Sequence, residues 1–187
     1  MQNQHSGNRK FRFLLVVALV SAALMAVPGL SPARADLGAA AKSVPSASLV
    51  GKGRLTFLGF KVFDAELYAP GGTYSPSEPF ALKLTYLRNF KGSAIAKRSA
   101  DEMRKLGASE AQLAKWTPQM EAIFPNVSPG QSITGVRTSS GKAAFYLGSR
   151  RIGTISDAAF TRRFFSIWLG NRTGNPTLRA KLVGMGS

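Results

Sequence analysis

The stretch that decides the fold is residues 58–68, Leu-Gly-Phe-Lys-Val-Phe-Asp-Ala-Glu-Leu-Tyr. In its second half, apolar and acidic residues alternate: one face carries Phe63, Ala65 and Leu67, and the other carries Asp64 and Glu66. Successive side chains of a strand point to opposite faces of a sheet, so this alternation predicts a strand with one buried face. The broader run 49–87 has the same character, with Pro70-Gly71-Gly72 marking a connection within it.

Similar alternation recurs further along the chain. Residues 80–88 place four apolar side chains on one face: Phe80, Leu82, Leu84 and Tyr86. Three later segments are also typical of strands: 131–138, 142–147 and 151–155. Short turns rich in Gly and Ser separate them, which predicts a β-meander.

Between and after these blocks the period changes to that of helices. Residues 95–106 carry one apolar face, and Ser109 to Gln112 has the spacing of a capping box that opens the next helix. Thr117-Pro118 predicts a break or kink in that helix. Asp157 and Asn175 are placed to begin the last two helices. The order predicts an α+β fold, an open-faced β-sandwich: a large, mostly antiparallel sheet with helices packed on one face.

The N-terminus has the pattern of an export signal. Residues 1–35 contain a basic start, an uncharged apolar core from Phe13 to Val27, and Ala33-Arg34-Ala35 as a cleavage motif. The apolar run is too short for a membrane span, so we predict a cleavable signal peptide and a periplasmic protein that starts near Asp36. An uncleaved N-terminal anchor is the alternative. Residues 36–48 are predicted to be a flexible lead-in with one short helix around Leu37 to Lys42, and residues 49–187 a single domain.

Composition limits the chemistry. The chain has no cysteine, and its single histidine, His5, lies in the predicted leader. Thiol chemistry, histidine-based triads and imidazole metal sites are therefore excluded from the mature chain, and we expect no metal and no cofactor. The leader holds four basic and no acidic residues, so its removal lowers the net charge from +16 to +12. Such a field attracts anions, although a solvated basic surface with no specific partner is the simpler interpretation. Export argues against nucleic acid as a partner.

Three segments together resemble the bacterial chalcone isomerase-like proteins. They are Gly53-Arg54 with residues 58–68, residues 82–92 running into Ile95 and Ser99, and residues 164–170 with their Ile-Trp-Leu-Gly run. A weaker match is residues 124–130. The resemblance extends from about Leu49 to Gly184 and implies a ligand cleft between the sheet and the helices.

The resemblance also indicates where a site would lie. Chalcone isomerases need a cation for the phenolate and hydroxyl donors near the carbonyl. The family's arginine corresponds to about Arg54, whereas three hydroxyl positions correspond to apolar residues here: Phe63, Ile95 and Ile167. Trp168 takes the place of the family's methionine. These replacements argue against the isomerase reaction, which remains a second alternative.

Our first hypothesis is therefore a non-catalytic protein that binds a fatty-acid-like or other apolar anion in that cleft. Arg54 would pair with the acidic head, together with Tyr86, and the lining would come from Phe63, Ile95, Ser99, Ile167 and Trp168. Plain structural roles are the competing interpretation: core packing for the apolar residues, and a surface position for Arg54. Arg162-Arg163 is interpreted as part of the solvent-exposed side of an amphipathic helix.

The second hypothesis is a basic periplasmic accessory protein without a small-molecule ligand. Its cationic surface would dock on an acidic partner or an anionic envelope surface. The volume of the cleft discriminates between the two hypotheses, because a ligand site needs roughly 300 Å³ or more of enclosed space.

Overall fold

The computed structural model describes residues 37–185, so the predicted signal peptide lies outside the described residues. Six strands form one sheet in the order β1-β2-β3-β4-β5-β6, and every neighbouring pair is antiparallel. The strands are β1 (Ala47–Phe57), β2 (Phe60–Pro70), β3 (Phe80–Tyr86), β4 (Ser132–Arg137), β5 (Ala143–Leu147) and β6 (Arg150–Ile155). The predicted meander and its antiparallel pairing are confirmed.

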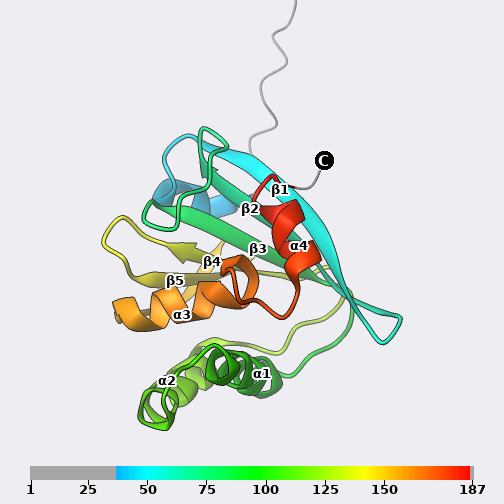
Figure 1. Cartoon of the computed structure of the whole chain (residues 1–187), viewed down its shortest axis with the longest axis vertical. Coiled ribbons are helices and arrows are strands. Elements are labelled where there is room, and N and C mark those ends of the chain that lie inside the picture. Colours follow the sequence, from blue (N-terminus) through cyan, green and yellow to red (C-terminus); the bar gives the residue numbers. More distant parts are fainter. Residues whose placement is uncertain (1–36, 186–187) are drawn as a thin grey trace, which may run out of the picture. The chain divides into compact units, whose positions relative to one another are not determined.

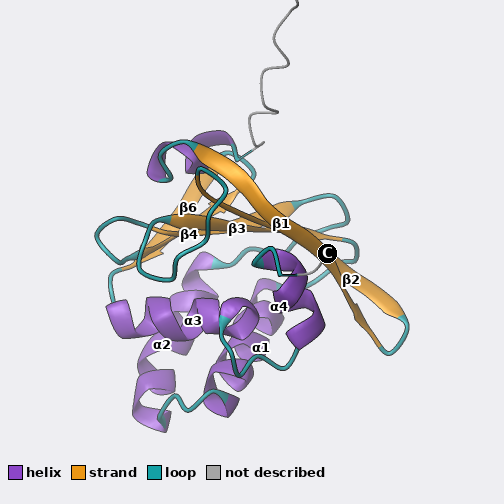
Figure 2. Cartoon of the chain, turned by 45° about the horizontal axis from the view of Figure 1, so that its top comes forward, coloured by secondary structure: helices purple, strands orange, loops and turns teal. Residues whose placement is uncertain are grey.

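Four α-helices cover one face of this sheet (Figure 1, Figure 2). They are α1 (Gly92–Lys105), α2 (Glu110–Ile123), α3 (Ala158–Leu169) and α4 (Pro176–Leu182). The α+β open-faced architecture is therefore as predicted. The core between the two layers is built by the alternating strand residues, including Phe63, Ala65 and Leu67, all at most 7% exposed.

Helix boundaries follow local capping. Ser109 accepts a hydrogen bond from the Gln112 amide and Gln112 bonds back, which completes the predicted capping box. Asp157 caps α3 by accepting bonds from two backbone amides. Of the break or kink predicted at Thr117-Pro118, the break is wrong, because α2 continues through Pro118. Apolar side chains on both sides of the proline, Leu113 and Met120 among them, are buried in the same core, which favours one continuous helix.

The short helix expected within the lead-in is present, and the segment packs on the sheet. Residues Gly38–Ser43 form a short 3₁₀ helix, η1, and β1 begins at Ala47 rather than at Leu49. Leu37, Ala40 and Val44 are each at most 1% exposed. They pack against the sheet face that the α-helices leave open, on side chains of Tyr68, Ala81, Val136, Ala144 and Tyr146. Burial of these apolar side chains holds the segment on the sheet, so part of this face is also covered (Figure 2).

Candidate functional site

The interior between sheet and helices is nearly filled. A cavity of about 30 Å³ remains there, lined by aromatic residues that include Phe124, Phe145 and Phe164. Phe145 and Phe164 contact each other edge to face, with ring centroids 5.2 Å apart. This space holds one or two water molecules, far less than the roughly 300 Å³ that a small-molecule site requires.

Four of the seven predicted site residues meet at this cavity. Tyr86 from β3, Ile95 and Ser99 from α1, and Trp168 from α3 all contribute to its lining. Tyr86 and Ser99 are both buried, at 5% and 6% exposed. Burial raises the pKa of the Tyr86 phenol well above its ordinary value. The cavity thus combines an apolar wall with two hydroxyls that can serve a bound water.

Phe63 and Ile167 lie beside this cavity rather than in its wall. Phe63 is 7% exposed and makes an edge-to-face contact with Tyr86, with centroids 6.1 Å apart. Ile167 is also 7% exposed, and its carbonyl accepts a 2.6 Å hydrogen bond from the Thr173 hydroxyl. Both residues therefore act in packing and in local structure here.

Arg54 is not at the cleft, which corrects its predicted placement. Its neighbour Gly53 faces α4, since a Cβ there would lie 2.7 Å from Leu178 Cδ1. Arg54 therefore points to the opposite face of the sheet. There it pairs with Asp64 through Nε to Oδ1 at 2.5 Å and Nη2 to Oδ2 at 2.9 Å. Donation from Arg54 lowers the pKa of the Asp64 carboxyl. The guanidinium is occupied by a carboxylate of its own chain.

An open groove lies on the other side of α3. It is about 530 Å³ in volume and runs between α3, α4, strands β3 and β4, and the β2–β3 loop. Apolar side chains make its floor: Tyr74, Phe80, Phe165 and Leu169. Phe80 contacts both Tyr74 and Phe165 edge to face, at centroid distances of 5.3 and 4.8 Å. We call this the arginine groove because of the side chains described next.

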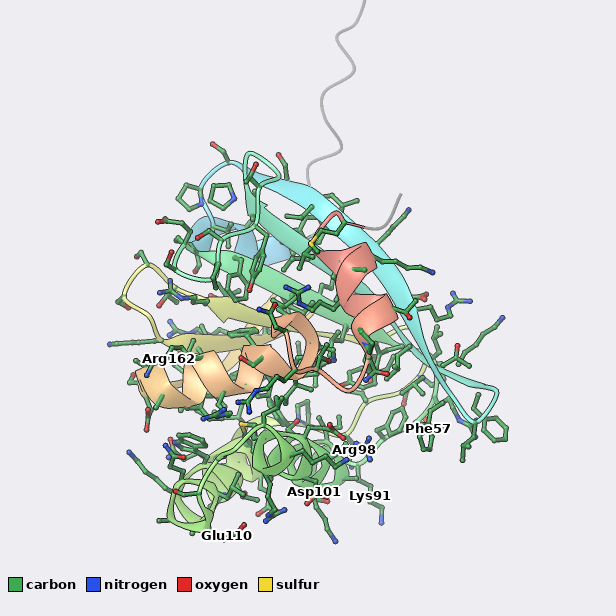
Figure 3. All side chains as sticks on the ribbon, in the orientation of Figure 1. Phe57, Lys91, Arg98, Asp101, Glu110 and Arg162 are labelled. Carbon is green, nitrogen blue, oxygen red and sulfur yellow. The ribbon has the colours of Figure 1, made fainter. Side chains whose placement is uncertain are left out.

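Three arginines from three elements line the arginine groove: Arg137 of β4, Arg162 of α3 and Arg179 of α4. None of them forms a salt bridge within the described part of the chain, and no acidic residue lines the groove. Arg179 is held in place by bonds from Nε to the Leu169 carbonyl, at 2.9 Å, and from Nη2 to Asn171 Oδ1, at 2.6 Å. Arg162 projects outward from α3 (Figure 3).

The charges of the arginine groove affect the pKa of Tyr74. Burial raises the pKa of its phenol, and the nearby charges of Arg179 and Arg137 oppose that rise. Two guanidinium groups therefore act on one phenol at the apolar floor. The sequence analysis did not identify the arginine groove because its three arginines are more than 15 residues apart in the chain. Arg162 by itself has the pattern of the solvent-exposed face of a helix. The lack of acidic residues around them was the available signal.

No group of acidic, cysteine or histidine side chains among residues 37–185 is arranged to hold a metal ion. In the same part of the chain, no helix has the length and apolar character needed to cross a bilayer.

An antiparallel sheet backed by a helical layer on one face defines an open-faced α+β architecture. The sequence profile of the family described as chalcone isomerase-like matches residues 46–184, so the chain belongs to the chalcone isomerase-like family. An uncharacterized protein of Haemophilus influenzae is 26% identical over 136 residues, which are 72% of this chain and 67% of the relative.

The fold has a solved counterpart in a plant protein. The crystal structure of a fatty-acid binding protein of Arabidopsis thaliana matches with a TM-score of 0.57 at 13% identity. The match covers 75% of this chain and 88% of that chain. At this level of identity the likeness establishes the shared fold.

Proposed function

We propose that the chain is a binding protein for an apolar small molecule with an acidic head, such as a fatty acid, and that it holds this molecule in the arginine groove. The ligand class is the one that the sequence suggested, but the proposed site differs. The interior cavity, at about 30 Å³, is too small for an enclosed ligand site, whereas the arginine groove is an open surface groove of about 530 Å³. The fatty-acid binding neighbour supports the same ligand class loosely.

The observation that carries this proposal is the set of Arg137, Arg162 and Arg179 above an aromatic floor without a described carboxylate partner. Like charges that line one groove repel each other, and an anion bound there relieves that repulsion. A guanidinium also binds carboxylate or phosphate through two parallel hydrogen bonds. The floor of Phe80, Phe165 and Leu169 would accept the apolar chain. The acidic head of the ligand would thus bind the arginines, and its apolar chain would lie on the apolar floor.

Binding is favoured over ring closure by the position of the cations. Cation-assisted ring closure needs a positive group beside the developing oxyanion. Within residues 37–185, no lysine or arginine lines the interior cavity. Arg54, the residue that the family resemblance implied for this role, is paired with Asp64 on the other face.

Dodecanoate and dodecanol provide the test, because they share an apolar chain and differ in the charged head. We expect dodecanoate to bind at least tenfold more tightly than dodecanol in a calorimetric titration. The double variant Arg137→Gln/Arg162→Gln should weaken dodecanoate binding roughly 10–100-fold, because hydrogen bonds to charged groups contribute about 1.5–3 kcal/mol. Binding of dodecanol should hardly change.

Arg54→Gln is the matched control, since it removes an arginine that lies outside the groove. We expect it to leave dodecanoate affinity unchanged. A loss of affinity in Arg54→Gln with none in the groove variant would overturn the proposed site. Equal affinities for dodecanoate and dodecanol would overturn the acidic-head requirement.

We also propose that the protein is exported, on the pattern of residues 1–35. Expression of the full chain in a Gram-negative host should yield a periplasmic product whose intact mass begins at Asp36. An intact mass that retains Met1, recovered with the membrane fraction, would contradict cleavage and favour the anchor alternative.

A further inference from the structure

The turn between β1 and β2 carries an exposed apolar cluster. Phe57, Leu58 and Phe60 are 59%, 80% and 59% exposed. They account for three of the five large apolar side chains that are exposed in the described part of the chain. We call residues 57–60 the aromatic tip. Scattered exposed apolar residues are ordinary on protein surfaces, but three within four positions at one apex are not.

The aromatic tip stands away from the rest of the molecule. Pairing of β2 with β3 begins at Phe63, so Phe60 and Phe57 pair in the sheet only with each other. A Cβ placed on Gly59 would have no atom within 4 Å. Both views show the β1–β2 ribbon extending past the neighbouring strands (Figure 1, Figure 2), and Phe57 lies on it (Figure 3). The exposed side chains of the aromatic tip are therefore accessible for insertion into a separate apolar phase.

The turn between β1 and β2 places a leucine, Leu58, in a backbone conformation that leucine disfavours. Leu58 and Gly59 have φ of +47° and +78°, as a two-residue type I′ hairpin requires. Asn, Asp or Gly is favoured at the first of these positions, because a leucine in the left-handed region is strained. Leu58 thus combines backbone strain with an 80% exposed apolar side chain. Both costs are offset if this side chain is buried in an apolar environment that the free chain lacks.

Cations flank the aromatic tip. The Arg88 guanidinium lies 4.8 Å from the centroid of the Phe60 ring, and Lys61 follows directly in sequence and is exposed. The nearby acid on this ribbon is Asp64, and its two oxygens are bound by Arg54. An apolar apex with a cationic collar is complementary to a bilayer whose headgroups are anionic.

The size of the aromatic tip also favours a bilayer over a protein. Its three apolar side chains expose roughly 400 Å² together, on the basis of 150–250 Å² for a full aromatic side chain. A stable protein interface buries about 800 Å² from each partner. Insertion into a membrane interface needs no more than the tip. We infer that the aromatic tip is an anchor that inserts at the surface of a membrane containing anionic lipid.

Vesicle flotation tests this inference with a chain that begins at Asp36 and retains the whole described core. The vesicles contain 30% phosphatidylglycerol in phosphatidylcholine, or phosphatidylcholine alone, in 50 mM NaCl. We expect the unmodified chain to partition at least tenfold more strongly onto the anionic vesicles. The variant Leu58→Asn should lose about tenfold of this binding, and Lys61→Gln/Arg88→Gln should remove most of the preference for anionic lipid.

The choice of asparagine separates anchoring from folding. Asn suits the left-handed turn better than Leu, so Leu58→Asn should keep or raise the melting temperature while it weakens vesicle binding. Leu49→Thr is the control, because Leu49 is a 44% exposed apolar residue near the other end of β1, and it should bind like the unmodified chain.

Unchanged vesicle binding of Leu58→Asn would overturn the inference, as would equal binding to both vesicle types. Failure of the unmodified chain to float with either vesicle would also overturn it, and would leave a protein as the partner of the aromatic tip. The aromatic tip and the arginine groove share no residue, so dodecanoate binding and vesicle binding can fail separately.

Discussion

Gly51→Ala is expected to lower the free energy of unfolding by about 3 kcal/mol, in the range of overpacking substitutions. A Cβ at this position would lie 2.0 Å from the Lys181 carbonyl oxygen and 2.7 Å from that of Leu182. Both atoms belong to the backbone at the end of α4, so no side chain can rotate away to make room. Either α4 or β1 must move by roughly 1 Å or more to restore ordinary contact distances.

Movement of α4 would also disturb the core and the arginine groove. Leu178 and Leu182 are 5% and 0% exposed and attach α4 to the sheet. Arg179 and Val183 line the groove from the same segment. Urea unfolding should show the loss of stability, and thermal unfolding should show a fall of roughly 6–12 °C for a domain of this size. Dodecanoate affinity should fall together with stability, because the groove wall shifts.

Gly174→Ala is the matched control. Gly174 also lies next to α4, but a Cβ there would meet only Glu102 Oε2, at 3.8 Å. We expect a change in stability within about 0.5 kcal/mol. Equal stability of the Gly51 and Gly174 variants would contradict the close approach of α4 to β1.

Most of the fold was predictable because local pattern and tertiary contact agree. The alternation of Phe63, Ala65 and Leu67 with acidic residues placed β2 correctly, since a sheet covered by helices on one face imposes that period. Capping residues such as Ser109 and Asp157 marked helix starts for the same reason. The short helix of the lead-in was expected but its packing was not, because Leu37, Ala40 and Val44 are buried by strands far along the chain.

The site was harder to predict because it depends on which side chains share a face. Gly53 and Leu55 alternate with Arg54, and Gly53 faces α4 while Leu55 packs on the core. This alternation places Arg54 on the other side, whereas the resemblance had placed it in the cleft. The arginine groove depends on Arg137, Arg162 and Arg179, which are brought together by sheet and helix packing. The positions of these three arginines in the sequence do not predict that they line one groove.

Asp157→Ala should destabilise the protein by about 3 kcal/mol at pH 6. Asp157 Oδ1 accepts from the amides of Ala159 and Phe160, at 2.9 and 3.1 Å, and so caps α3. Oδ2 accepts from Trp116 Nε1 at 3.0 Å and from Lys115 Nζ at 3.1 Å. Loss of a cap costs about 1 kcal/mol, and a buried donor left without a partner costs about 1–3 kcal/mol more. Trp116 is 1% exposed, and its indole N–H donates to this carboxylate.

The effect should depend on pH. Donation from Trp116, followed by that from the Phe160 amide, Lys115 and the Ala159 amide, lowers the pKa of Asp157 from 3.8 to about 2, against the opposing effect of burial. A group whose folded pKa is depressed contributes stability that is complete above its unfolded pKa and is lost as pH falls through the folded value. The full shift corresponds to about 2.4 kcal/mol at 1.36 kcal/mol for each pKa unit. Because the side chain is 22% exposed, solvent screening reduces this to about 1–2 kcal/mol.

Urea unfolding of the unmodified chain and of Asp157→Ala at pH 6, 4, 3 and 2 measures this dependence. The stability difference between them should be constant from pH 6 to about pH 4 and should then narrow by about 1–2 kcal/mol toward pH 2, as the carboxylate becomes protonated. Asp157→Asn keeps the shape of the side chain without the titration, so against Asp157→Ala its difference should stay flat with pH. Trp116→Phe removes the donor that lowers the pKa of Asp157 most, and should move the narrowing of the stability difference to higher pH. A difference between the unmodified chain and Asp157→Ala that stays constant down to pH 2 would show that the charge of Asp157 contributes nothing to the link between α2 and α3.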